Sequence, residues 1–97
     1  MHRASVERRL NDAHQQLVRA RTELAVLDEQ LIAANEMADD TRVRALVAEN
    51  PAASKDHDEA SRQAKVILRS RDELIDRIAD LERRRDELLD RLVVGAG

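Results

Sequence analysis

The residues best suited to chemistry in this sequence are three histidines, because the chain contains no cysteine. Without cysteine, it can form no disulfide, thiolate nucleophile or thiolate metal site. Only His57 lies among acidic residues, in the run Asp56-His57-Asp58-Glu59. Such groups can ligate cations, but neighbouring residues of a helix point around its axis rather than toward one point. We therefore expect the solvated start of a helix and no metal site, and a metal protein built on His57 is a remote alternative.

Other functional classes lack the residues that they need. No pair of nucleophile and base, glycine-rich phosphate loop or pocket of paired carboxylates can be assembled, so we expect neither catalysis nor a cofactor. The one basic run, Arg83-Arg84-Arg85, is surrounded by acidic residues, and the chain has a net charge of −3 and no aromatic side chain. We therefore expect no nucleic-acid binding. The polar positions are mixed in sign, which disfavours binding to a membrane surface.

The composition favours long helices in a single domain. The chain has 97 residues, of which 38% are charged, with two glycines and one proline. Few places to turn and no aromatic residue for a thick core leave long helices as the solution. The N-terminus has no apolar run after its positive charges, and no stretch approaches a membrane span, so we expect a cytoplasmic protein. The preference for Arg over Lys, with abundant Ala, Asp and Val, is typical of a high-GC bacterial genome.

Apolar residues recur in each half of the chain in steps of four and three, the spacing of a left-handed coiled-coil seam. The first half contains Val6, Leu10, Ala13, Leu17, Ala20, Leu24, Leu27, Leu31, Ala34 and Ala38. The second contains Ala60, Ala64, Ile67, Arg71, Leu74, Ile78, Leu81, Arg85, Leu88 and Leu92. Facing residues have numbers that sum to 98, as Leu17 and Leu81 do. This symmetry predicts an all-α fold, an antiparallel two-helix coiled-coil hairpin.

Two of these seam positions hold arginines, Arg71 and Arg85, opposite Leu27 and Ala13. Their aliphatic stems can pack in the seam while the guanidinium groups reach its edge. Alternatively, they fix the register of the two helices, as buried polar residues do in some coiled coils.

The single domain, 1–97, is expected to contain a helix over 3–38, a short helix or helix extension over 41–49, a turn over 50–53 and a helix over 54–94. Pro51 cannot continue a helix and biases Asn50 away from the helical conformation. Ser54 is predicted to cap the second long helix, and Gly95 to end it.

A second set of apolar residues lies beside the seam. It consists of Val18, Ala25, Ile32, Leu68, Ile75 and Leu89, which we call the side stripe. In an antiparallel pair these residues face one side, where a free hairpin has no third helix to cover them. The stripe could simply widen the core face. We favour self-association, with two hairpins forming a homodimeric four-helix bundle.

The heptad register is expected to fail near the middle of the chain, over residues 39–60. Residues 39–60 hold three basic and six acidic residues, a sum of −3, which equals the whole net charge. Val43, Leu46 and Val47 would occupy outer positions if the first helix ran straight on. Asp39-Asp40-Thr41 could instead stop one helix and cap another, shorter one.

This region has two interpretations. The short helix could fold its apolar side back over the alanine-rich end of the hairpin. Alternatively, the region is a partner-binding site, since departures from regularity tend to mark functional sites. We call its residues the tip cluster: Asp39, Asp40, Arg42, Val43, Arg44, Leu46 and Val47.

The stretch Ala-Asp-Asp-Thr-Arg-Val-Arg-Ala-Leu-Val-Ala-Glu-Asn-Pro, over 38–51, resembles the central segment of short, uncharacterised coiled-coil proteins of actinobacteria. The resemblance covers most of the chain and implies a fold. A second likeness is architectural: Gre-type transcript-cleavage factors insert an acidic coiled-coil tip into the secondary channel of RNA polymerase. By that analogy Asp39 and Asp40 would be the tip acids, although this chain lacks the second globular domain of such factors.

We therefore expect a non-enzymatic protein–protein interaction or scaffold coiled coil. It would self-associate through the side stripe and contact another protein through the tip cluster. The alternative is a Gre-like transcription regulator that acts on RNA polymerase.

Overall fold

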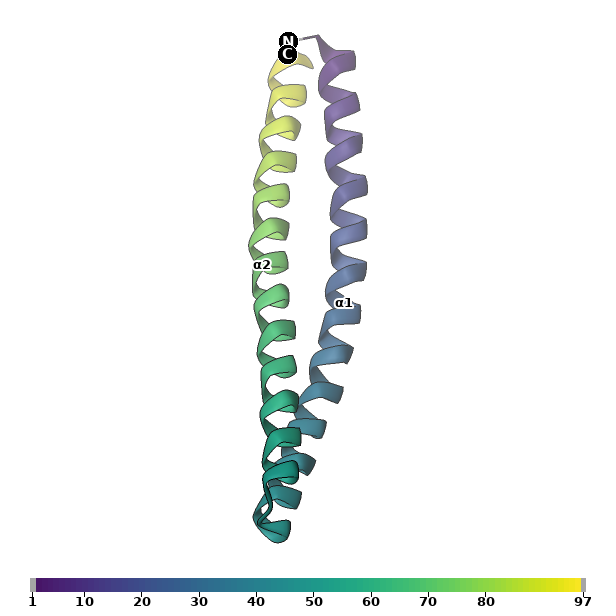
Figure 1. Ribbon diagram of the computed structural model, residues 1–97. Coiled ribbons are helices and arrows are strands. Elements are labelled where there is room, and N and C mark those ends of the chain that lie inside the picture. Colours follow the sequence, from purple (N-terminus) through teal and green to yellow (C-terminus); the bar gives the residue numbers. More distant parts are fainter. Residues whose placement is uncertain (1, 97) are drawn as a thin grey trace. The chain divides into compact units, whose positions relative to one another are not determined.

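Two long helices make up the chain. The computed structural model describes the backbone of residues 2–96 and the side chains of residues 2–94. Within this range the elements are α1 (Arg3–Ala48) and α2 (Pro51–Ala96), with no strand (Figure 1). The predicted all-α class is confirmed. Met1 and Gly97 of the predicted domain 1–97 lie outside the described residues.

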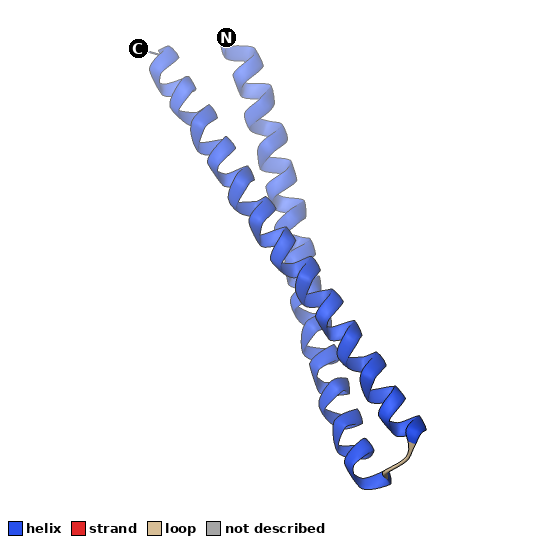
Figure 2. Ribbon diagram, turned by 60° about the vertical axis from the view of Figure 1, so that its left-hand side comes forward, coloured by secondary structure: helices blue, strands red, loops and turns tan. Residues whose placement is uncertain are grey.

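Contacts between the helices divide the chain into two compact units. Unit 1 combines residues 1–24 with 74–97, and unit 2 comprises residues 25–73. In each unit a segment of α1 lies beside a segment of α2. Unit 2 contains the short loop that joins the helices, so it is an antiparallel helical hairpin (Figure 2). The expected hairpin is confirmed to this extent, whereas its dimerisation into a four-helix bundle stays a prediction.

Unit 1 holds a continuous apolar core along the predicted seam. The buried residues are Val6, Ala13, Leu17 and Ala20 of α1 and Leu74, Ile78, Leu81 and Leu88 of α2. Leu10 and Leu92 are partly buried and pack against Val6, Ala13 and Leu88. Leu17 is completely buried. The heptad spacing therefore predicts correctly which face of each helix packs in this unit.

The seam of unit 2 is thinner. Of the residues that the structure describes there, only Ala64 and Thr41 are fully buried. Leu27, Leu31 and Ile67 lie on the seam but are half-buried. Alanine and arginine at the neighbouring seam positions explain this openness, because alanine covers little surface and arginine turns its charged end outward.

The turn consists of Glu49 and Asn50 and lies earlier than the sequence suggested. Glu49 has φ 49°, and its N–H donates to the carbonyl of Ala45 over 3.2 Å, which ends α1 in a left-handed cap. The Oδ1 atom of Asn50 accepts a hydrogen bond of 2.8 Å from the Ala53 N–H. Asn50 is therefore the cap of α2, and Pro51 takes the first helical position.

Three predicted boundaries change as a result. Residues 41–48 extend the first helix without a break at 39–41, which is one of the two predicted alternatives, and Glu49 belongs to the turn instead. Ser54 lies inside α2 and caps nothing at its start, because Asn50 already does so. Gly95 does not end the helix, which continues to Ala96.

The two seam arginines behave differently from one another. In unit 2, Arg71 Nε donates to the carboxylate of Asp28 on α1, and Asp72 lies 4.0 Å from Arg71 Nη1. In unit 1, Arg85 pairs with its own neighbour Asp86 at 3.2 Å. Of the two seam arginines, Arg71 therefore links the two helices and Arg85 does not.

Candidate interaction surfaces

The side stripe of unit 1 is exposed along one edge of its seam. That edge is marked by Arg21 of α1 and Glu82 of α2, whose charged atoms lie 4.0 Å apart. Val18 precedes Arg21 by three residues, and Ile75 and Leu89 lie seven residues from Glu82, so helical periodicity puts them on the same edge. Each of these three apolar side chains is between 37% and 49% exposed. Unit 1 therefore presents apolar surface there.

A groove of about 430 Å³ lies on this edge of unit 1. It is lined by Glu7, Leu10, Asn11, His14, Arg85 and Leu89. Leu10 and Leu89 provide apolar walls, and the polar residues surround them. The groove could receive an apolar side chain of another protein.

The side stripe of unit 2 is also exposed on one edge, which the ion pair of Asp28 with Arg71 marks. Ile32 follows Asp28 by four residues and Leu68 precedes Arg71 by three, so both lie on the face of that pair. Ile32 is 60% exposed and Leu68 44%, and Ala25 is exposed as well. The structure thus brings each part of the stripe to an open edge, within the unit to which it belongs.

The tip cluster lies on the outer surface of the last turns of α1. Its three apolar members, Val43, Leu46 and Val47, are 51%, 68% and 80% exposed. The idea that a short helix folds these residues back over the alanines is therefore wrong. Asp39, Asp40, Arg42 and Arg44 are likewise exposed. The cluster is an open patch of apolar and charged side chains.

Asp39 and Asp40 are not at the turn. They precede Glu49 by ten and nine residues, which corresponds to about 14 Å along a helix. The analogy with Gre-type factors needs acidic groups at the end of the coiled coil. No observation here therefore favours the polymerase alternative.

Sequence analysis missed a polar pair in the seam of unit 2, Thr41 and His57. Thr41 is buried, and its hydroxyl donates to the carbonyl of Met37 over 2.8 Å, with the carbonyl of Ala38 at 3.1 Å. The Nδ1 atom of His57 lies 3.2 Å from the Ala38 carbonyl and 3.4 Å from the Thr41 hydroxyl oxygen. Because a carbonyl only accepts, we assign the ring proton to Nδ1, which donates to Ala38.

The numbers of this pair fit the relation that holds for facing seam residues, whose numbers sum to 98. The numbers 41 and 57 sum to 98, as do 45 and 53, and half of 98 is 49, the number of the turn residue. The seam therefore continues to the turn with Thr41, Ala45, Ala53 and His57 in place of large apolar residues. The polar types of Thr41 and His57 hid this continuity. His57 is thus a seam residue rather than part of a cation site.

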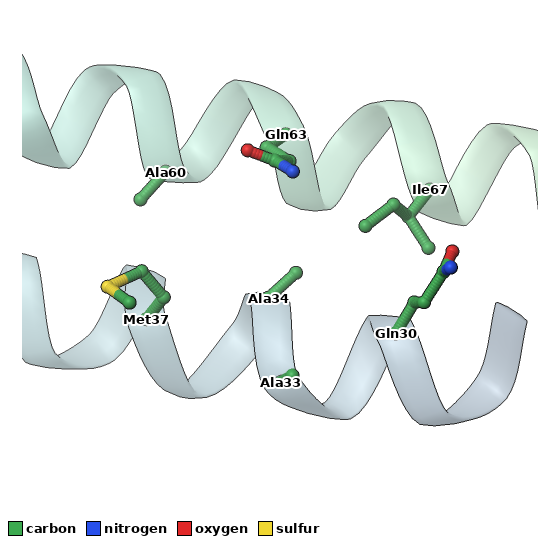
Figure 3. A pocket seen from close by; sticks show the side chains of 7 residues that line it. All are labelled: Gln30, Ala33, Ala34, Met37, Ala60, Gln63 and Ile67. Atoms are coloured by element: carbon green, nitrogen blue, oxygen red, sulfur yellow. The ribbon is translucent and has the colours of Figure 1, made fainter. Parts of the chain in front are cut away.

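A groove of about 480 Å³ opens on the other edge of unit 2, away from the ion pair of Asp28 and Arg71. Its lining consists of Gln30, Ala33, Ala34 and Met37 of α1 and Ala60, Gln63 and Ile67 of α2 (Figure 3). Ile67 and Ala34 point toward the opposite helix, and the small alanines leave the space between the helices open. Met37 is 54% exposed.

The groove continues toward the turn. A second hollow of about 290 Å³ shares Met37, Ala60 and Gln63 with it and adds Thr41, Arg44, Asp56 and Glu59. The combined groove is therefore mainly uncharged at the end near Ile67 and carries two acids and one base at the end near the turn. We call it the open groove.

In residues 2–96, no three histidine, aspartate or glutamate side chains come together in a way that could hold a metal ion. Over the same range, neither helix contains a stretch long and apolar enough to cross a membrane.

Comparison with known proteins supplies no relative: no family model, curated protein or solved structure matches the chain.

Proposed function

We propose that the chain is a non-enzymatic protein–protein interaction module that self-associates through the side stripe and binds a partner through the tip cluster. The observation that carries the proposal is the exposure of large aliphatic side chains at the stripe in both units, up to 60% for Ile32. Contiguous exposed apolar surface with a polar border is typical of sites where proteins associate. The long helices supply regular faces for such contacts.

Self-association follows from the thin packing of the isolated chain. Two helices share one narrow seam, and in unit 2 only Ala64 and Thr41 of the described residues are fully buried. A second copy on the side stripe would cover Ile32 and Leu68 and add apolar burial to that seam. Two hairpins packed in this way would form a homodimeric four-helix bundle.

Sedimentation equilibrium tests self-association. The proposal predicts twice the chain mass of 11.0 kDa at micromolar concentration. Ile32→Glu should shift the equilibrium to monomer, because it buries a charge in the contact. A monomer of the unaltered chain throughout the micromolar range would contradict the proposal.

The tip cluster supports contact with a different protein. Val43, Leu46 and Val47 lie on the outer surface of α1 and are exposed, and charged residues flank them. An apolar centre with a polar rim is the usual make-up of a protein interface. A partner of matching shape could bury the three aliphatic side chains together.

A pull-down with the tagged chain tests this contact. The triple substitution of Val43, Leu46 and Val47 by Ser should lose a protein that the unaltered chain retains. The matched control replaces two other exposed valines, Val93 and Val94, by Ser and should retain it. If the triple variant and the unaltered chain recover the same proteins, the tip cluster binds no partner.

A further inference from the structure

We propose that the open groove of unit 2 binds one amphipathic helix of another protein, with an apolar stripe and a lysine or arginine at the end near the turn. The proposal does not rest on the function proposed above. Of the residues in the stripe and the tip cluster, only Arg44 lines the groove.

The first support is an absence of charge along the edge of the groove at its end near Ile67. The residues beside the seam there are Gln30, Ala33 and Met37 of α1 and Gln63, Val66 and Ser70 of α2. None of the six is charged, although 38% of the chain is. The equivalent heptad positions of unit 1 hold charged residues such as Arg19, Glu23 and Asp80. Charged side chains beside the seam of a coiled coil favour contact with water. Because the groove edge lacks them, this surface is suited to being covered by another protein segment.

The second support is the shape of the groove. Its floor is formed by alanines, and Met37 stands 54% exposed at its side. Val66, which is 61% exposed, follows the lining residue Gln63 by three residues, so helical periodicity puts it beside the groove on the same edge of α2. From Gln30 to Arg44 the groove follows fifteen residues of α1, which span about 21 Å or four helical turns. Small floor residues allow a third helix to approach closely, and methionine adapts to the side chains of its partner.

Charge determines the occupant. At the end near the turn, Asp56 and Glu59 outnumber Arg44, whereas the other end is uncharged. A helix with a basic residue at the turn end would satisfy the acids. A second copy of this chain could pack its groove against this one in two orientations. In one, the two acidic ends would meet, and in the other the acidic end would meet the uncharged end. Neither arrangement places a net positive charge beside Asp56 and Glu59.

Methyl NMR of Met37 tests the inference directly. The chain has two methionines, and the variant Met37→Leu identifies the signal of Met37 by its loss. The probes are two synthetic amphipathic peptides of about four helical turns with the same leucine stripe, one ending in two lysines and the other in two glutamates. The lysine peptide should shift the Met37 methyl signal in a saturable way. The affinity of the glutamate peptide should be lower by a factor of about ten or more.

Matched variants locate the binding. Val66→Glu places a charge at the groove and should weaken the lysine peptide about tenfold or more. The control variant Val93→Glu changes an exposed valine of unit 1 that belongs to none of the proposed binding surfaces, and it should leave binding unchanged. Circular dichroism confirms that both variants remain helical. A reporter methionine on the side stripe, Val18→Met, should not respond to either peptide.

Five outcomes would overturn the proposal. The first four are a Met37 signal that neither peptide moves, equal binding of both peptides, equal weakening by the two glutamate variants, and a response of the Val18→Met reporter without one at Met37. A Met37 signal that moves with chain concentration in the absence of peptide would assign the groove to a second copy, which also contradicts it. None of these results depends on whether the side stripe dimerises or the tip cluster binds a partner.

Discussion

At the scale of single residues, the turn combines one strained residue with one well-suited cap. Glu49 adopts the left-handed conformation at φ 49°, and Asn50 caps α2 with its side chain. A residue with a Cβ atom is disfavoured in that conformation, whereas glycine is not. The chain therefore makes its turn in two residues without glycine, at some cost in stability.

Replacing Glu49 by glycine should stabilise the protein. The relief of the left-handed strain exceeds the greater chain entropy of glycine in the unfolded state, so the free energy of unfolding should rise by about 0.5 to 1 kcal/mol. Urea denaturation followed by circular dichroism measures the change. Glu49→Ala, which keeps a Cβ atom, is the control and should show no such gain. A loss of stability on introducing glycine would show that Glu49 is not strained.

Arg71 is a charged residue in the seam. The hydrogen bond to Asp28 and the charge of Asp28 raise the pKa of the Arg71 guanidinium, Asp72 adds to this, and desolvation opposes it. A base whose pKa is raised on folding stabilises the fold at every pH below its ordinary value and loses this contribution only above it. For arginine that limit lies far above neutral pH.

Arg71→Leu should raise the melting temperature, because a leucine opposite Leu27 fills the seam while Asp28 is exposed enough to remain solvated. The increase should be the same from about pH 6 to about pH 9, where arginine does not titrate. Arg71→Ala, which removes the ion pair without filling the seam, should lower the melting temperature. Thermal denaturation of the three proteins at both pH values tests this, and a lower melting temperature for the leucine variant would mean that the ion pair stabilises more than packing does.

At the scale of elements, the predicted seam and the observed core agree best where the side chains are large. All the buried apolar residues of unit 1 lie on the predicted seam. The register also continues to the turn in unit 2. The seam residues there are small alanines and the polar threonine and histidine, so the spacing of large apolar residues does not reveal it. The sequence places the turn too late because Pro51 predicts an interruption of the helix there. Proline suits the first position of a helix, and Asn50 before it is an N-cap residue.

The difference between the two units predicts unequal effects of the same substitution. Leu17 and Leu31 occupy the same heptad position, but Leu17 is fully buried and Leu31 only half-buried. Leu17→Ala should lower the free energy of unfolding by about 3 kcal/mol, and Leu31→Ala by about half as much. Chemical denaturation of both variants makes the comparison. Equal losses would indicate that Leu31 is covered in solution, as it would be if another chain lay beside it.

At the scale of the whole molecule, the sequence predicts which surfaces are open better than what covers them. The positions of Ile32, Leu68 and Leu89 beside the seam follow from helical periodicity alone. The open groove could not be foreseen in this way, because it depends on the space that Ala34 and Ala60 leave between the helices. A partner is specified by the shape and charge of its own surface, which this sequence does not contain.

The side stripe and the open groove differ in how they should affect the dependence of the melting temperature on protein concentration. If the side stripe joins two copies, folded chains stabilise one another by mass action, and the melting temperature must rise with protein concentration. A tenfold increase in concentration is worth about 1.4 kcal/mol per dimer, enough for a clear shift. Ile32→Glu should abolish this dependence, whereas Val66→Glu, beside the open groove, should preserve it. Scanning calorimetry of both variants at several concentrations decides between the surfaces: the reverse pattern would assign self-association to the groove and leave the stripe free for another protein.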